Sequence, residues 1–185
     1  MTRLRHDPLT QSLHWIIALA VIVAYAIGLV REELPKGDFR AWLLGLHMSI
    51  GMLVVGLTVV RIAWRLATPA PAEVPMAPPV RLAAKAGHLA LYVALLALPV
   101  IGLLAAWIKG RNVVLFDLVP LPSPLAVDKP FGERLEGIHE LAGHATMILA
   151  GLHAAAAIGH QWILRDGTLG RMLPFVAGPR SSAAE

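Results

Sequence analysis

Four long stretches of this chain contain no Asp, Glu, Lys or Arg, and they constrain its fold more than any other feature. They cover residues 8–30, 41–60, 86–108 and 141–164, and each holds at least 20 residues. A helix of about 20 residues spans a bilayer hydrocarbon core of about 30 Å. Helices on the surface of soluble proteins carry charged side chains along one face, and these stretches carry none. The sequence therefore predicts an all-α, integral membrane four-helix bundle.

The ends of these stretches predict the helix limits and the organisation of the chain. We expect helices at about 10–30, 41–65, 84–108 and 137–164, which form one domain over residues 1–165, followed by a cytoplasmic C-terminal tail at 166–185. The five Trp residues lie at the ends of the stretches, where indole rings prefer the membrane interface. The connections 68–80 and 109–136 are rich in Pro, and we expect both to lack helix.

Composition excludes several classes of protein. Hydrophobic residues make up 57% of the chain and charged residues only 15%, and there is no Cys. Disulfide scaffolds, thiolate metal sites, iron–sulfur clusters and covalently attached c-type haem all need Cys. The lipid bilayer is the expected partner, and we expect no nucleic acid and no obligatory protein partner.

The charged residues between the helices predict the orientation of the chain. The side that holds both termini has nine basic and four acidic residues, whereas the other side has seven basic and eight acidic residues. Basic residues accumulate on the cytoplasmic side of membrane proteins. We therefore expect both termini in the cytoplasm.

Histidines are unusually frequent for so apolar a chain. Seven of the eight lie in or at the edge of the predicted spans, and they are His14, His47, His88, His139, His144, His153 and His160. An ionisable residue within a span is costly and marks a functional site by default. His6 lies in a polar tail and receives no role.

The spacing of these histidines favours two stacked macrocycles. His139 and His153 are 14 residues apart, which places them on one helix face about 21 Å apart along the axis. Matching the depths of the other histidines pairs His14 with His153 and His47 with His139, and two stacked b-type haems with paired axial histidines follow. His144 is rotated by about 140° from His139 and is expected to be structural. Small residues near these positions fit a flat macrocycle, or equally close helix packing.

Several short motifs, in this order and spacing, make the chain similar to the bacterial cytochrome b561 family of diheme membrane proteins. The motifs are SLHW at 12–15, LHMSIG at 46–51, GHLALY at 87–92, ALPVIGL at 97–103, IHE at 138–140, GLHAAAA at 151–157 and GHQW at 159–162. The resemblance implies a multi-pass protein of the bacterial inner membrane. It also implies haem ligands at His14, His47, His139 and His153, in agreement with the depth argument.

The resemblance implies a superoxide oxidase, an enzyme that passes the electron of superoxide to ubiquinone. The resemblance implies a quinone site at His88 and His160, although each could also be an interfacial side chain. Histidine can donate both a hydrogen bond and a proton to a quinone. Superoxide is an anion that cations near the outer haem would concentrate. Lys109 and Arg111 are the best placed for this role.

Arg134 and Arg40 are the next candidates for the superoxide site, and basic residues at helix ends also simply mark the membrane interface. An alternative function is a haem-bearing anchor that carries electrons between quinone and a dehydrogenase or hydrogenase. A transition-metal transporter is disfavoured because none of the four stretches contains Asp or Glu. The small size of the chain favours the superoxide oxidase over the anchor.

Overall fold

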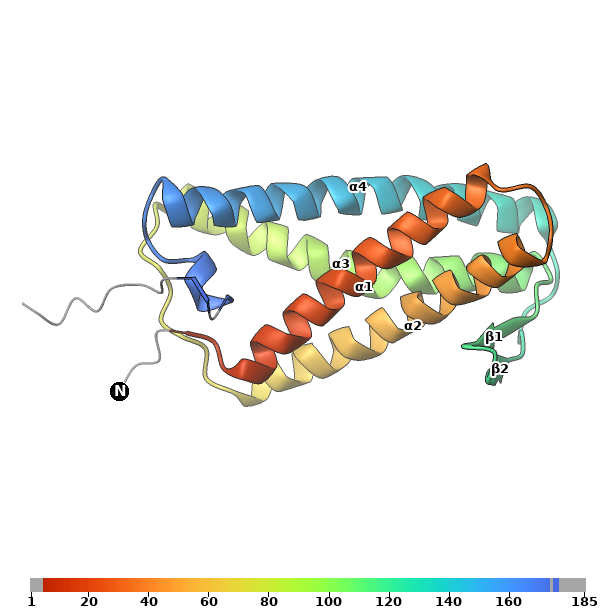
Figure 1. The fold of residues 1–185 in the computed structure, drawn as a ribbon, viewed down its shortest axis with the longest axis horizontal. Coiled ribbons are helices and arrows are strands. Elements are labelled where there is room, and N and C mark those ends of the chain that lie inside the picture. The colour runs from red at the N-terminus through yellow and green to blue at the C-terminus, as the bar shows by residue number, and fades with distance from the viewer. Residues whose placement is uncertain (1–4, 174, 177–185) are drawn as a thin grey trace, which may run out of the picture.

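The computed structural model describes residues 5–173, 175 and 176, and it contains four long helices (Figure 1). They are α1 (Pro8–Glu33), α2 (Asp38–Ala67), α3 (Pro78–Ile108) and α4 (Lys129–Trp162). All four are long and apolar enough to cross a membrane. The predicted membrane four-helix bundle is confirmed.

Successive helices run in opposite directions, so the bundle has two distinct ends (Figure 1). The start of α1, the connection 68–77 and the end of α4 lie at one end, which we call the termini end. The α1–α2 connection and a small β-hairpin lie at the other, which we call the hairpin end.

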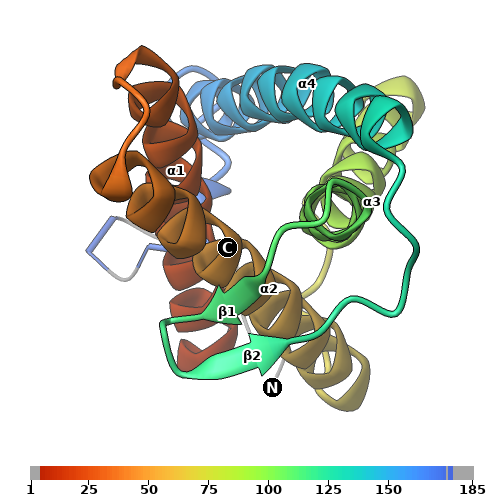
Figure 2. The same ribbon diagram turned by 90° about the vertical axis from the view of Figure 1, so that its right-hand side faces the viewer.

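The helices pack as two pairs around a central space. α1 lies against α2 and α3 lies against α4, and a smaller contact between α2 and α3 joins the pairs. Figure 2 shows the four helices surrounding the axis of the bundle. The buried apolar side chains are few, whereas large ones such as Leu19 and Leu141 are exposed on the outside. That distribution suits a bundle whose outer surface faces lipid.

The α4 helix begins earlier than the sequence predicted. The connection 109–136 was expected to lack helix, but α4 starts at Lys129 with Pro130 in its first turn. Proline is tolerated there because the first N–H groups of a helix have no partner within the helix. The Asp128 carboxylate accepts the N–H of Phe131 and caps this turn. Pro78 and Pro79 begin α3 in the same way.

A two-stranded hairpin, which the sequence did not predict, occupies part of the same connection. Strands β1 (Val113–Leu115) and β2 (Val119–Leu121) pair antiparallel. Phe116 and Asp117 have positive φ at the turn. The hairpin is attached to two helices, because Phe116 N–H donates to Ser49 Oγ and the Trp107 indole donates to the Leu121 carbonyl. Three-residue strands are too short to produce a readable alternation.

Residues 68–77 contain no helix, but the connection predicted to lack helix extended to residue 80, and α3 already begins at Pro78 because proline is tolerated in a first helical turn. The division into a bundle and a tail at residue 166 stays a prediction. Residues 174 and 177–185 of that tail lie outside the described part of the chain, as do Arg3, Arg180 and Glu185 from the charge count. Directly after α4, a 3₁₀ turn, η1 (Leu169–Arg171), folds back toward α1. The Trp15 indole donates to the Met172 carbonyl at 2.9 Å.

Asp7 ties the start of α1 to the end of α2. Its carboxylate accepts the N–H and the hydroxyl of Thr10, and also the indole N–H of Trp64 at 3.0 Å. Desolvation raises the pKa of Asp7, but these hydrogen bonds outweigh it and lower the pKa to about 2. A carboxyl with a lowered pKa stabilises the folded state above its unfolded pKa of about 3.9, and that contribution is lost as the pH falls toward 2.

We expect Asp7→Ala to lower the stability of the bundle by about 1–2 kcal/mol, because it removes a helix cap together with a bond between helices. The difference in stability between wild type and variant should have its full size at pH 7 and should shrink as the pH falls below 4. Thermal unfolding in detergent at pH 7, 4 and 3 measures it. Asp128→Ala, which removes only a cap, is the matched control and should cost less. Equal losses in the two variants would contradict a stabilising role for the Trp64 contact.

Candidate functional site

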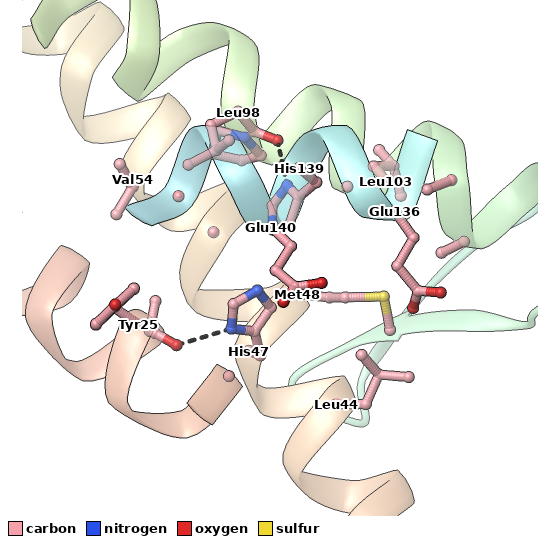
Figure 3. Close-up of a pocket in the computed structure, with 18 of the residues that line it drawn as sticks. Tyr25, Leu44, His47, Met48, Val54, Leu98, Leu103, Glu136, His139 and Glu140 are labelled. Atoms are coloured by element: carbon pink, nitrogen blue, oxygen red, sulfur yellow. Dashed lines mark hydrogen bonds between the residues drawn. The ribbon is translucent and has the colours of Figure 1, made fainter. Parts of the chain in front are cut away.

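Near the hairpin end, His47 from α2 and His139 from α4 face each other across the bundle (Figure 3). Their ring centroids are 5.9 Å apart and the ring planes are inclined by 80°. His47 Nδ1 lies 2.8 Å from the carbonyl of Ala24, and His139 Nδ1 lies 2.9 Å from the carbonyl of Leu98. Since a carbonyl only accepts, each Nδ1 carries the proton. Each Nε2 therefore keeps a lone pair for a metal.

A glycine on α3 makes room for the His139 ring. A Cβ placed on Gly102 would lie 2.8 Å from Cε1 and 2.9 Å from Nδ1 of His139. Contacts this short do not occur in real structures, so a side chain at Gly102 would displace the ring from the Leu98 carbonyl. On α1, a Cβ placed on Gly28 would be in ordinary van der Waals contact with the His47 ring, 3.5 Å from its Cε1.

The two rings line a large cavity enclosed by all four helices. Its unfilled space, including the part open to the outside, is about 1410 Å³. The lining is mostly apolar, and four of its glycines come from the four different helices, namely Gly28, Gly51, Gly102 and Gly143. The cavity can accept a flat and largely apolar group.

Closer to the termini end, three histidines gather on three helices. The ring centroids of His14 and His153 are 6.3 Å apart, and those of His88 and His153 are 5.3 Å apart. His14 comes from α1, His88 from α3 and His153 from α4. The structure thus brings both predicted pairs together and also places His88 beside the second pair.

The spacing within the pairs fits two axial ligands on one iron. Imidazole nitrogens bind metal ions at about 2 Å, so nitrogens on opposite sides of one ion lie about 4 Å apart and the ring centres somewhat farther. Such pairs can hold b-type haem, because haem supplies the remaining ligands itself. Within the described residues, no group of three or more His, Cys, Asp or Glu side chains could hold a bare metal ion.

The two predicted superoxide-site cations lie at the rim of the cavity, but they are not free. Lys109 and Arg111 line it, and both form ion pairs with Glu136, with Arg111 at 3.5 Å. Arg31 also lines the cavity, and its charge acts on Glu136. Arg31 was not predicted as a site residue, because two acidic residues follow it at the end of α1.

Arg40 and Arg134, the next candidates, lie outside the cavity lining. Arg40 instead donates to the Leu34 carbonyl at 2.6 Å. The sequence could not show that these two side chains lie outside the lining, because both residues are near the same bundle end as Lys109 and Arg111.

His144 lies in the cavity lining, although its rotation from His139 predicted that it points away from the ligands. Its Nδ1 is 2.7 Å from the hydroxyl of Tyr25 on α1. The difference arises because the lining spans a wide sector of α4, which includes Gly143 and Met147. The hydrogen bond connects α1 to α4 across the cavity, which suits the structural role expected of His144.

His160 lies two turns beyond His153, about 10 Å farther along α4. Its ring is largely buried, and Nδ1 donates to the carboxylate of Asp166 at 2.5 Å. The sequence singled out His160 but not Asp166. No pattern linked the two, because Asp166 lies beyond the end of the helix in an irregular turn.

Together, four membrane-spanning helices and histidine pairs on facing helices define a membrane cytochrome that transports electrons. A family model described as prokaryotic cytochrome b561 matches residues 5–175. The chain belongs to this family, so it is a multi-pass bacterial membrane protein that carries b-type haem.

Relatives from several bacteria match over nearly their whole length. The chain is 30% identical to the probable superoxide oxidase CybB of Yersinia pestis, over 94% of this chain and 98% of the relative. It is 33% identical to cytochrome b561 homolog 2 of Escherichia coli, over 91% of each. It is 31% identical to cytochrome b562 of Cereibacter sphaeroides, over 88% of this chain and 90% of the relative.

Proposed function

We propose that this protein is a superoxide:ubiquinone oxidoreductase of the bacterial inner membrane with two b-type haems. The observation that supports this most is the cavity near the hairpin end, where Lys109 and Arg111 stand at the rim of the space that His47 and His139 line. The similarity to a probable superoxide oxidase adds support. At 30% identity, this similarity supports the family, and the substrate is inferred from the cavity.

In this proposal His47 and His139 hold one haem, and His14 and His153 hold the other. Bound there, the haems supply one-electron transfer across the membrane. The residues of the chain keep each ligand in place. The carbonyls of Ala24 and Leu98 orient the first pair by accepting the Nδ1 protons of His47 and His139.

At the hairpin end, the chain attracts superoxide to the cavity. Lys109, Arg111 and Arg31 bring three positive charges to the rim. Glu136, Glu32 and Glu140 also line the cavity and oppose them. We therefore propose a weak attraction, concentrated where Lys109 and Arg111 share a single carboxylate.

At the termini end, the chain binds ubiquinone and supplies the protons for its reduction. His160 and His88 donate hydrogen bonds to the quinone oxygens in this proposal, and two superoxide ions reduce one quinone with the uptake of two protons. Both termini lie in the cytoplasm, so superoxide enters from the periplasm. This sidedness follows the excess of basic residues at the termini end.

Two opposite changes at the rim test the superoxide step. Lys109→Gln with Arg111→Gln should slow the reduction of the haems by superoxide about tenfold, the lower range of electrostatic steering. Glu136→Gln should accelerate it, since it releases the same two cations. Both effects should weaken as salt rises, because the screening length falls to about 8 Å at physiological ionic strength. Pulse-generated superoxide followed by haem absorbance gives these rates.

A matched control is Lys36→Gln with Lys129→Gln, which removes two exposed cations from the same end outside the cavity lining. A structural disturbance would slow both rim variants, whereas steering predicts opposite signs. Rates that are insensitive to salt and to all these changes would reject the rim as the superoxide site. If superoxide does not reduce the haems and ubiquinol does, the protein is an electron carrier between quinone and a partner.

A further inference from the structure

At the termini end, the largely buried ring of His160 lies in close contact with the carboxylate of Asp166. Nδ1 of His160 lies 2.5 Å from Oδ2 of Asp166, and both side chains are less than one-fifth exposed. Charge-assisted hydrogen bonds are shorter than neutral ones, and this contact is at least as short as such bonds usually are. Because Nδ1 donates to Asp166, Nε2 is the nitrogen that can face a bound molecule.

The structure around Asp166 holds its carboxylate in place. Oδ1 accepts the N–H of Thr168 at 3.0 Å and its hydroxyl at 2.6 Å, and the Asp166 N–H donates to the His160 carbonyl at 3.2 Å. Gly167 has a φ of +74°, which lets the chain turn sharply between these two residues.

The segment that carries Asp166 is itself attached to α1 and α4. The Gly170 N–H donates to the side chain of Gln161 on α4. The Arg171 carbonyl accepts the N–H of His6 and the side chain of Gln11. The carboxylate therefore does not need to move or be ordered when a ligand binds, which is the condition for an effective positioning group.

We infer that Asp166 is a positioning residue for proton exchange between His160 and quinone, acting by orienting Nδ1–H and stabilising the cationic ring. This inference rests on the proposed quinone site. Quinone reduction takes two electrons from the haems and two protons, and in each proton transfer the Nε2–H bond of the cationic His160 ring breaks while an O–H bond forms on the quinone. Water at the termini end returns the proton to Nε2. In quinol oxidation the same proton moves in the opposite direction, and Asp166 stays ionised throughout.

The ionisation of Asp166 is consistent with this role. Burial raises the pKa of its carboxyl, but hydrogen bonds from His160 and Thr168 outweigh burial and leave the pKa below its usual value. A carboxylate in a histidine pair orients the ring and stabilises its protonated form without taking up the proton.

The test is the reduction of the oxidised, haem-loaded protein by decylubiquinol in stopped flow, which needs no superoxide. Asp166→Asn keeps an acceptor for Nδ1–H but removes the charge. We expect its limiting rate to fall about tenfold or more, as far as the roughly 10²–10⁴-fold that general acid–base catalysis contributes in full. The half-saturating quinol concentration should change little. Asp166→Glu restores the charge and should recover part of the rate.

A double variant tests whether Asp166 acts through His160. On a His160→Gln background, Asp166→Asn should cause almost no further loss, because coupled residues are not additive. Glu73→Gln, which removes one exposed negative charge at the same end, is the control and should react as the wild type does. Haem absorbance and thermal stability check that each variant is intact. If Asp166→Asn loses haem, Thr168→Val is the second variant, and it should lower the same limiting rate less strongly.

Three results would overturn the inference. An unchanged limiting rate in Asp166→Asn and Thr168→Val would leave Asp166 a purely structural residue. A full additional loss on the His160→Gln background would show that Asp166 does not act through His160. If decylubiquinol reduces wild type and His160→Gln equally, or reduces neither, the proposed quinone site fails and this inference fails with it.

Discussion

Replacing His47 or His139 by Ala should remove one haem and leave the other, and replacing His14 or His153 should do the reverse. In the proposed arrangement each replacement takes one of two protein ligands from a haem iron, and the two histidine pairs lie at different levels of the bundle. Haem content by the pyridine haemochrome method should fall from two haems per chain to about one. Redox titration should show which of two potentials is lost, and it should be the same one for both members of a pair.

His88→Ala is the critical control for this pairing. The His88 ring is nearer to His153 than the His14 ring is, with centroids at 5.3 Å against 6.3 Å. We expect His88→Ala to keep both haems, since His14 remains to complete the pair. Loss of haem in His88→Ala, with retention in His14→Ala, would make His88 the ligand and move His14 to the quinone site.

Enlarging Gly102 should weaken the binding of the proposed haem near the hairpin end, although no ligand is replaced. A Cβ at this position overlaps the His139 ring at 2.8 Å. The ring cannot turn aside without losing both its bond to the Leu98 carbonyl and its alignment with His47. Loss of such a supporting contact typically lowers metal affinity 10–100-fold. We expect partial haem loss in Gly102→Ala and nearly complete loss of that haem in Gly102→Val.

Gly56→Ala is the matched control, because a Cβ at this exposed position of α2 meets no atom within 4 Å. It should keep both haems. Haem titration of the purified apoprotein, followed by absorbance, gives the two affinities separately. Equal affinities in wild type and Gly102→Val would mean that the ring adopts another position when haem is bound.

The depth of each histidine was predictable because a helix rises by a constant 1.5 Å per residue. That regularity places His47 level with His139 and His14 level with His153, provided that each helix crosses the membrane once. The structure agrees on both neighbours. The same rule could not show that His88 lies within ring contact distance of His153, because the gap between two helices depends on how they cross.

The limits of the helices were less predictable than their number. Charge-free runs located the spans but not the turns beyond them, where Pro130 starts α4 rather than preventing it. A helix that continues into water keeps its backbone hydrogen bonds while its side chains become polar. The apolar stretch in the sequence therefore ends before the helix does. The hairpin at 113–121 is held by Ser49 and Trp107, contacts that a local pattern does not contain.

By itself, the sequence determined that four helices cross a membrane, which histidines share a level, and which family the motifs resemble. These properties follow from hydropathy and from the fixed repeat of a helix. Only the tertiary structure decided that Gly102 clears the His139 ring, that Glu136 pairs with Lys109 and Arg111, and that Asp166 reaches His160. Each of these contacts joins different helices or an irregular turn, so it depends on rotation and crossing, which the order of residues along one helix does not specify.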